Sequence, residues 1–154
     1  MVPNDVRRAL SAYGKQSLDT SVEQASPHKL IVMLFDGAIA SLNQAKFHME
    51  NAAIAEKGQA ISRAIAIIED GLRLSLDKEK GGELAENLDS LYDYISYRLL
   101  LANLENSLPD LEQGLDLLVQ LRSSWVEIDL VINQSANDLE ASNRNQALLS
   151  YGRV

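Results

Sequence analysis

Residues 82–106 carry apolar side chains on two opposite sides of one predicted helix. At about 100° per residue, one set recurs every three or four positions and is wide enough to face a core; its members are Leu84, Leu88, Leu91, Tyr92, Ile95, Leu99 and Ala102. A second set lies roughly opposite, in the C-terminal half: Tyr94, Tyr97, Leu100, Leu101 and Leu104. Because a surface helix of a small bundle is polar there, this helix is either buried all round or offers an apolar face to a partner.

Three further segments are amphipathic on one side only, and together the four predict an all-α fold. Ser26 and Pro27 mark the start of the first of these segments, with a capping hydroxyl followed by proline at the first helical position. Alternating strand patterns are missing. Four such helices with short connections pack most simply as an antiparallel up-down four-helix bundle. The three segments span residues 26–55, 59–76 and 107–132. In residues 59–76 the side chains predicted to face inward are Ile61, Ala64, Ile65, Ile68, Leu72 and Leu76. In residues 107–132 they are Leu111, Leu115, Leu118, Leu121, Trp125 and Ile128.

The chain divides into an N-terminal arm (residues 1–25), a helical bundle (residues 26–132) and a C-terminal tail (residues 133–154). The arm is predicted to hold a short helix, and its apolar anchors Leu10 and Tyr13 can fold back on the bundle until a partner displaces them. The tail is rich in Asn, Ser and Gln and weakly periodic, which predicts weak order with at most a short, loose C-terminal helix.

Composition excludes several classes of function. A chain of 154 residues can bury one respectable core without disulfides or metals. It has no cysteine, so disulfides and thiolate metal sites are excluded. A net charge of −8 argues against binding to nucleic acid, which needs a basic surface. No apolar run reaches 18 residues and the N-terminus lacks a secretory apolar region, which predicts a cytoplasmic protein without membrane insertion.

The titratable residues form no recognisable catalytic, metal or cofactor site. His28 and His48 are the only histidines, and the chain has neither a Glu-x-x-His pair nor a phosphate loop. His48 lies on an apolar stripe, where a core histidine is the simplest interpretation; a phosphotransfer histidine would have to be exposed. Arg98 borders one apolar stripe and Arg122 lies within another. We expect each to form a structural ion pair, with Asp36 or Asp93, or to extend its charged end to the surface; the alternative is a polar anchor for a partner's backbone.

Apolar residues on neighbouring segments extend the second face of residues 82–106 into a predicted groove. Ile67 and Leu74 point away from the inward stripe of residues 59–76, and Leu117 lies at the edge of the stripe of residues 107–132. Monomers seldom expose a large apolar patch without a function, and helix-in-groove recognition suits such a track. A client, the tail or a second copy in a homodimer would cover it. The predicted client-binding groove comprises Tyr94, Tyr97, Leu101, Leu104, Ile67, Leu74 and Leu117.

Several stretches resemble the flagellar secretion chaperones that serve flagellin. Tyr13 is like the family's N-terminal tyrosine, although Phe35 stands where the family often has tyrosine. The similar stretches are residues 25–39 (ASPHKLIVMLFDGAI), which resemble the opening helix, residues 82–95 (GELAENLDSLYDYI) and 98–103 (RLLLAN), which resemble the third helix, and residues 121–125 (LRSSW), which resemble the end of the fourth.

The resemblance implies a cytoplasmic antiparallel bundle without catalytic activity. Such a chaperone binds the C-terminal segment of newly made flagellin, which is disordered when free and gains helix as it wraps around the bundle. Binding prevents premature polymerisation and keeps the subunit ready for the flagellar type III export apparatus, while the N-terminal arm occupies part of the surface when no client is present. Two alternatives stay open from the residues alone: a phosphotransfer signalling domain acting through His48, and a structural homodimer.

Overall fold

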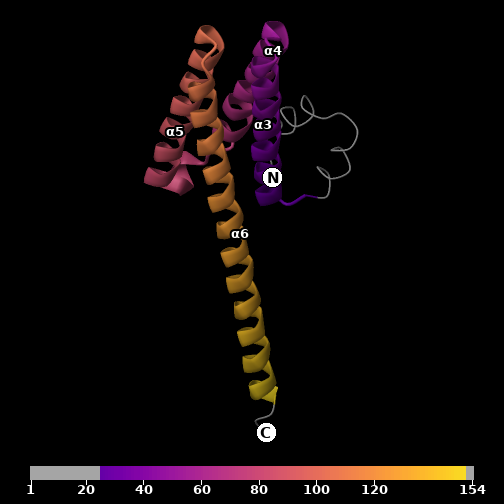
Figure 1. Cartoon of the computed structure of the whole chain (residues 1–154). Coiled ribbons are helices and arrows are strands. Elements are labelled where there is room, and N and C mark those ends of the chain that lie inside the picture. The colour runs from indigo at the N-terminus through magenta and orange to yellow at the C-terminus, as the bar shows by residue number, and fades with distance from the viewer. Residues whose placement is uncertain (1–24, 152–154) are drawn as a thin grey trace. The chain divides into compact units, whose positions relative to one another are not determined.

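The computed structural model describes residues 25–151, which form helices joined by short turns and contain no strand (Figure 1). This confirms the predicted all-α class. Leu10 and Tyr13 of the predicted arm lie outside the described residues. The structure divides into two units, which meet in sequence at Arg122 and Ser123. The helices are α3 (Pro27–Glu50), α4 (Ile54–Ile67), the π-helical η1 (Ile68–Arg73), α5 (Lys78–Glu105) and α6 (Leu108–Tyr151).

Polar contacts show that α3 runs antiparallel to the first part of α6. The Lys46 ammonium lies 3.4 Å from the Glu112 carboxylate, and the Arg122 guanidinium donates a hydrogen bond to Asp36. A step of ten residues forward along α3 therefore corresponds to ten residues backward along α6. The Arg122–Asp36 pair confirms one of the ion pairs that the sequence predicts.

The combination of α4 and η1 runs antiparallel to α5 by the same criterion. Lys57 Nζ donates to the Asn103 carbonyl at 3.0 Å near one end, and Arg73 Nε donates to Asp89 at 2.7 Å near the other. Neighbouring helices thus alternate in direction, as Figure 1 shows for α3 to α5.

The core is formed by side chains of α3, α4, η1, α5 and the first part of α6. The rings of Phe35 on α3 and Tyr92 on α5 are 6.4 Å apart and both are buried. Burial raises the pKa of the Tyr92 hydroxyl far above its ordinary value, so this tyrosine is a neutral core residue. The largest fully buried side chains are Phe35, Leu30, Leu34, Leu42, Ile61, Ile68, Leu72, Ile95, Leu99, Leu111 and Leu118.

Helix α3 is the one helix of the described residues whose length and composition would also suit a membrane span. Its apolar stripe is instead buried against the other helices of the bundle, which is what a core helix requires. Ser26 caps the helix by accepting a hydrogen bond from the Lys29 amide at 3.2 Å, and Pro27 follows it, as the sequence predicts.

The start of α5 is kinked at Gly82. Asp77 accepts hydrogen bonds from the Glu79 and Lys80 amides, and a first turn forms before the predicted helix start. Gly82 then adopts φ 50° and ψ −127°, a conformation that side chains with a Cβ avoid. The predicted core residue Leu84 lies in the first turn after this kink, at the end of the restarted helix, and is 64% exposed; Ala85 is the first buried residue of α5.

Helix α6 continues beyond its predicted end near Ile132 and ends at Tyr151. The sequence has no glycine or proline between Gly114 and Gly152, so nothing along this stretch stops a helix. The described side chains of residues 137–148 are all exposed, and so is Ile128, which the sequence places facing inward.

Candidate functional site: the outer face of α5

The C-terminal half of α5 presents an apolar face away from the core. It consists of five residues, which we call the outer face of α5: Tyr94, Tyr97, Leu100, Leu101 and Leu104. Tyr97 is 57% exposed and Leu104 is 72% exposed; Tyr94 and Leu100 are also exposed, and Leu101 is half-buried. The opposite side of the same turns is buried and consists of Tyr92, Ile95, Leu99 and Ala102. The helix is therefore not buried all round: one apolar side faces the core, and the other is exposed on the surface of the bundle.

The outer face is confined to the last three turns of α5. Toward the N-terminus the corresponding outward positions carry Glu86, Ser90 and Asp93, which are exposed and polar. From Tyr94 to Leu104 the helix rises about 15 Å at 1.5 Å per residue. An apolar strip of this length accommodates about three turns of a partner helix.

Tyr94 is held at the border between α5 and α6. Its hydroxyl oxygen accepts hydrogen bonds from Arg98 Nε at 2.9 Å and from Gln113 Nε2 at 3.2 Å. The Arg98 guanidinium also lies 5.4 Å from the centre of the Tyr94 ring. The ring is therefore fixed in place before any partner arrives, which lowers the entropic cost of binding.

Arg98 joins α5 to the start of α6. Its Nη1 donates to Asp110 at 2.8 Å, so the partner is neither Asp36 nor Asp93, which the sequence suggests. Hydrogen bonds to the Tyr94 hydroxyl and to Asp110 raise the pKa of the guanidinium above its ordinary value, so it stays charged. The sequence leaves two roles open for Arg98, and this contact assigns it a structural ion pair.

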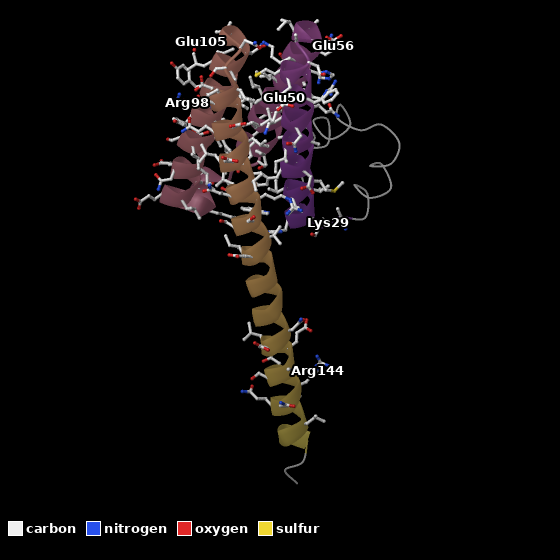
Figure 2. The ribbon with its side chains drawn as sticks, in the orientation of Figure 1. Lys29, Glu50, Glu56, Arg98, Glu105 and Arg144 are labelled. Atoms are coloured by element: carbon white, nitrogen blue, oxygen red, sulfur yellow. The ribbon has the colours of Figure 1, made fainter. Side chains whose placement is uncertain are left out.

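The C-terminal end of α5 is capped from α4. Asn106 has the left-handed conformation that ends helices, and its amide donates to the Ala102 carbonyl. The Asn103 carbonyl, which has no partner in its own helix turn, accepts from Lys57, a lysine that is almost fully buried. Glu56 and Glu105 mark the same end of the bundle in Figure 2.

An ion cluster fixes the other half of α5 against η1. Arg73 bonds Asp89 at 2.7 Å, Glu69 at 3.0 Å and Asp93 at 3.1 Å. The Arg73 guanidinium lowers the pKa of the Asp89 carboxyl below its ordinary value. Since Asp93 and Tyr94 are adjacent in sequence, this cluster ends where the outer face begins.

The structure separates the predicted groove residues into three groups. Tyr94, Tyr97, Leu101 and Leu104 share the outer face of α5. Leu117 is half-buried on α6, one turn beyond Gln113, the residue that contacts Tyr94. Leu74 is exposed, but it follows Arg73 and so lies level with Asp89, about 12 Å along α5 from Tyr97.

Ile67 does not belong to the predicted groove. It is only 3% exposed and is part of the core, contrary to the prediction that it points outward. The buried stripe of α4 is wider than the sequence suggests because α4 packs against both α3 and α5. Ala60 and Ile67 therefore extend the buried stripe on one side, while the predicted inward residue Ile65 is only half-buried.

Two exposed apolar residues escaped the sequence prediction. Phe47 on α3 and Ile54 at the start of α4 are both more than half exposed, near the turn between these helices. Phe47 lies two positions after the buried Ala45, and a large aromatic residue outside the apolar stripe was the signal that the sequence offered. Ile54 begins a helix after a turn, where periodicity is too short to assign a face.

Chemically, the arrangement is suited to binding. His48 is half-buried with its ring edge-on to Phe47 at 5.6 Å. Within residues 25–151, no cluster of three or more His, Asp or Glu side chains could hold a metal ion. The features that remain are an exposed apolar face, a fixed hydroxyl at its border and helices locked on both sides of it.

Comparison with known proteins identifies relatives over most of the chain. Residues 9–131 match the model of the family described as flagellar protein FliS. The flagellar secretion chaperone FliS of Salmonella typhimurium is 46% identical over 119 residues, which cover 77% of this chain and 88% of the relative. FliSB of Pseudomonas aeruginosa is 44% identical over 118 residues (77% and 93%), and FliS of Escherichia coli is 39% identical over 120 residues (78% and 88%).

Proposed function

The chain belongs to the FliS family of flagellar secretion chaperones, and from this premise we propose that it binds the disordered C-terminal segment of flagellin in the cytoplasm. It acts by binding and not by catalysis. Holding the segment prevents premature polymerisation of flagellin and keeps the subunit competent for the flagellar type III export apparatus.

The exposed outer face of α5 is the observation that carries this proposal. Tyr97 and Leu104 leave large apolar surfaces in contact with water, although the core beneath them is complete. A client that is disordered when free can lay an amphipathic helix on this face and gain the helix as it binds. Leu101, on the same face, and Leu117, at its border on α6, add apolar contact.

The test measures the affinity of the chaperone for a peptide of the C-terminal segment of flagellin from the same bacterium, by isothermal titration calorimetry. In the double variant Tyr97→Asp/Leu104→Asp we expect the affinity to fall by about 100-fold or more, because burying each apolar side chain contributes roughly 1.5–3 kcal/mol. Both side chains are exposed, so the fold is expected to survive.

Leu84→Asp is the matched control. Leu84 is an equally exposed leucine on the same helix, but it lies before the outer face begins. We expect this variant to bind flagellin like the wild type. Wild-type affinity in the Tyr97→Asp/Leu104→Asp variant, with its helix content intact, would contradict the proposed face. Sedimentation of the free chain separates the remaining alternative: a homodimer that uses this face would dissociate in the double variant.

A further inference from the structure

The hydroxyl group of Tyr94 has an unusual set of hydrogen-bond partners. Its oxygen has two acceptor positions, and Arg98 Nε and Gln113 Nε2 both donate to it. Both donors come from the bundle itself, one from α5 and one from α6. The hydroxyl proton therefore has to point away from Arg98 and Gln113, toward the exposed side of the ring, where the residue is 36% accessible.

The neighbours of Tyr94 strengthen it as a donor. Arg98 is permanently charged and is itself held by Asp110 at 2.8 Å. Hydrogen bonds that an oxygen accepts polarise its own O–H bond, so the outward proton becomes a better donor. The ring cannot turn the proton inward without giving up one of the two bonds. Tyr94 is thus a directed donor at the border of an otherwise apolar face.

We propose that Tyr94 is a specificity-determining residue, whose hydroxyl donates a hydrogen bond to a carbonyl oxygen of the bound flagellin segment. This inference rests on the proposed function. Apolar contacts along the outer face supply affinity, but a helix can slide along them by one turn at small cost. A single directed donor fixes the position of the client, because any other register leaves a buried carbonyl unpaired.

The carbonyl can belong to the main chain or to a side-chain amide of the client. A client helix leaves its last four main-chain carbonyls without partners, and one of these can accept from Tyr94. Asparagine and glutamine side chains of the client present the same chemistry. If alanine substitution of one such side chain in the peptide abolishes the effect of Tyr94→Phe, the acceptor is that amide; if none does, it is the main chain.

The test uses two substitutions that remove the outward proton in different ways. Tyr94→Phe deletes the hydroxyl. Gln113→Glu keeps the hydroxyl but supplies a carboxylate on α6 that accepts its proton, in place of the amide that donates to it. For each single variant we expect about 3- to 10-fold weaker binding of the flagellin peptide, the range for loss of one neutral hydrogen bond. Gln120→Glu, an equal charge change on an exposed residue of α6 outside the outer face, is the control and should bind like the wild type.

The double variant Tyr94→Phe/Gln113→Glu provides the decisive measurement. If Gln113→Glu acts only through the tyrosine proton, it has no further effect once the hydroxyl is gone, and the double variant binds like Tyr94→Phe alone. Wild-type affinity in Tyr94→Phe overturns the inference, as does an undiminished effect of Gln113→Glu in the Tyr94→Phe background. The proposed function would still stand in either case, provided that Tyr97→Asp/Leu104→Asp loses the client.

Discussion

At the scale of single residues, contacts between side chains far apart in the sequence fix the positions of the helices. The sequence predicts that Arg122 pairs with Asp36 or Asp93, and the structure confirms Asp36. The contact from Lys57 to the Asn103 carbonyl could not be predicted, because lysine is normally exposed and its burial depends on a helix end supplied by another element. The residue type shows that a side chain is charged, but the fold decides which group it contacts.

Two glycines distinguish tight from loose packing at this scale. A Cβ on Gly114 would lie 2.7 Å from Leu99 Cδ2, and Leu99 is fully buried and cannot yield. A Cβ on Gly58 would meet Asn103 Oδ1 at 3.6 Å, an ordinary contact. We expect Gly114→Val to lower the free energy of unfolding by about 1–3 kcal/mol, and Gly58→Ala to raise it by about 0.5–1 kcal/mol through helix propensity.

Urea denaturation of both variants at neutral pH measures the difference. Both positions are helical, so each substitution raises helix propensity relative to glycine, and a loss of stability in Gly114→Val is due to packing. A Gly114 variant as stable as the wild type would mean that α5 and α6 can separate at Leu99 without cost.

At the scale of elements, α5 shows what periodicity can and cannot predict. Its two apolar sides follow from spacing alone and are confirmed by Ile95 inside and Tyr97 outside. The π-helical η1 does not follow from spacing, since one wider turn leaves no mark in the apolar pattern. η1 carries Arg73, which joins it to α5, and so the ion cluster beside the outer face was not foreseen.

Because of this cluster, we expect the bundle to lose stability at acidic pH. Hydrogen bonds from Arg73 hold the pKa of the Asp89 carboxyl below its ordinary value of 3.8. A group whose pKa is lower in the folded state stabilises the fold above its unfolded pKa, and this contribution is lost as the pH falls through the folded pKa. We expect Asp89→Asn to lower the melting temperature at pH 7, and the gap to the wild type to close as the pH falls below about 4.

Melting curves followed by circular dichroism between pH 7 and pH 3 test this expectation. Asp70→Asn, an equal change on an exposed position of η1, is the control and should differ little from the wild type at any pH. A gap for Asp89→Asn that stays constant over the whole range would show that its carboxylate is not stabilised by Arg73.

At the scale of the whole molecule, the all-α bundle and its helix order could be predicted, while the phase of each stripe could not be predicted in detail. Ile67 is buried because α4 meets two neighbours, and Leu84 is exposed because it lies at the end of the restarted helix, directly after the kink at Gly82. Both errors arise from tertiary context, which sets how wide the buried stripe of a helix is and where along the helix burial begins. The exposure of Tyr97 and Leu104 follows from the periodicity of one helix, and the client-binding groove stays a prediction.

The C-terminal part of α6 leads to the last prediction. Every described side chain of residues 137–148 is exposed, so a chain that ends at residue 136 loses no described core contact. Tyr97 and Leu104 are exposed in the full chain, so we also expect no competitor to be removed from the outer face. The truncated chain should melt within about 2–4 °C of the full chain and bind the flagellin peptide with unchanged affinity.

The full-length double variant Leu139→Asp/Leu148→Asp is the control, because it keeps the length while removing the two exposed leucines of this segment. It should behave like the wild type in both measurements. A rise in affinity of about tenfold on truncation, equivalent to 1.4 kcal/mol, would instead mean that the C-terminal segment competes with flagellin. Such a rise in the double variant as well would assign the competition to these leucines, and the outer face of α5 would then be a surface that the chain itself regulates.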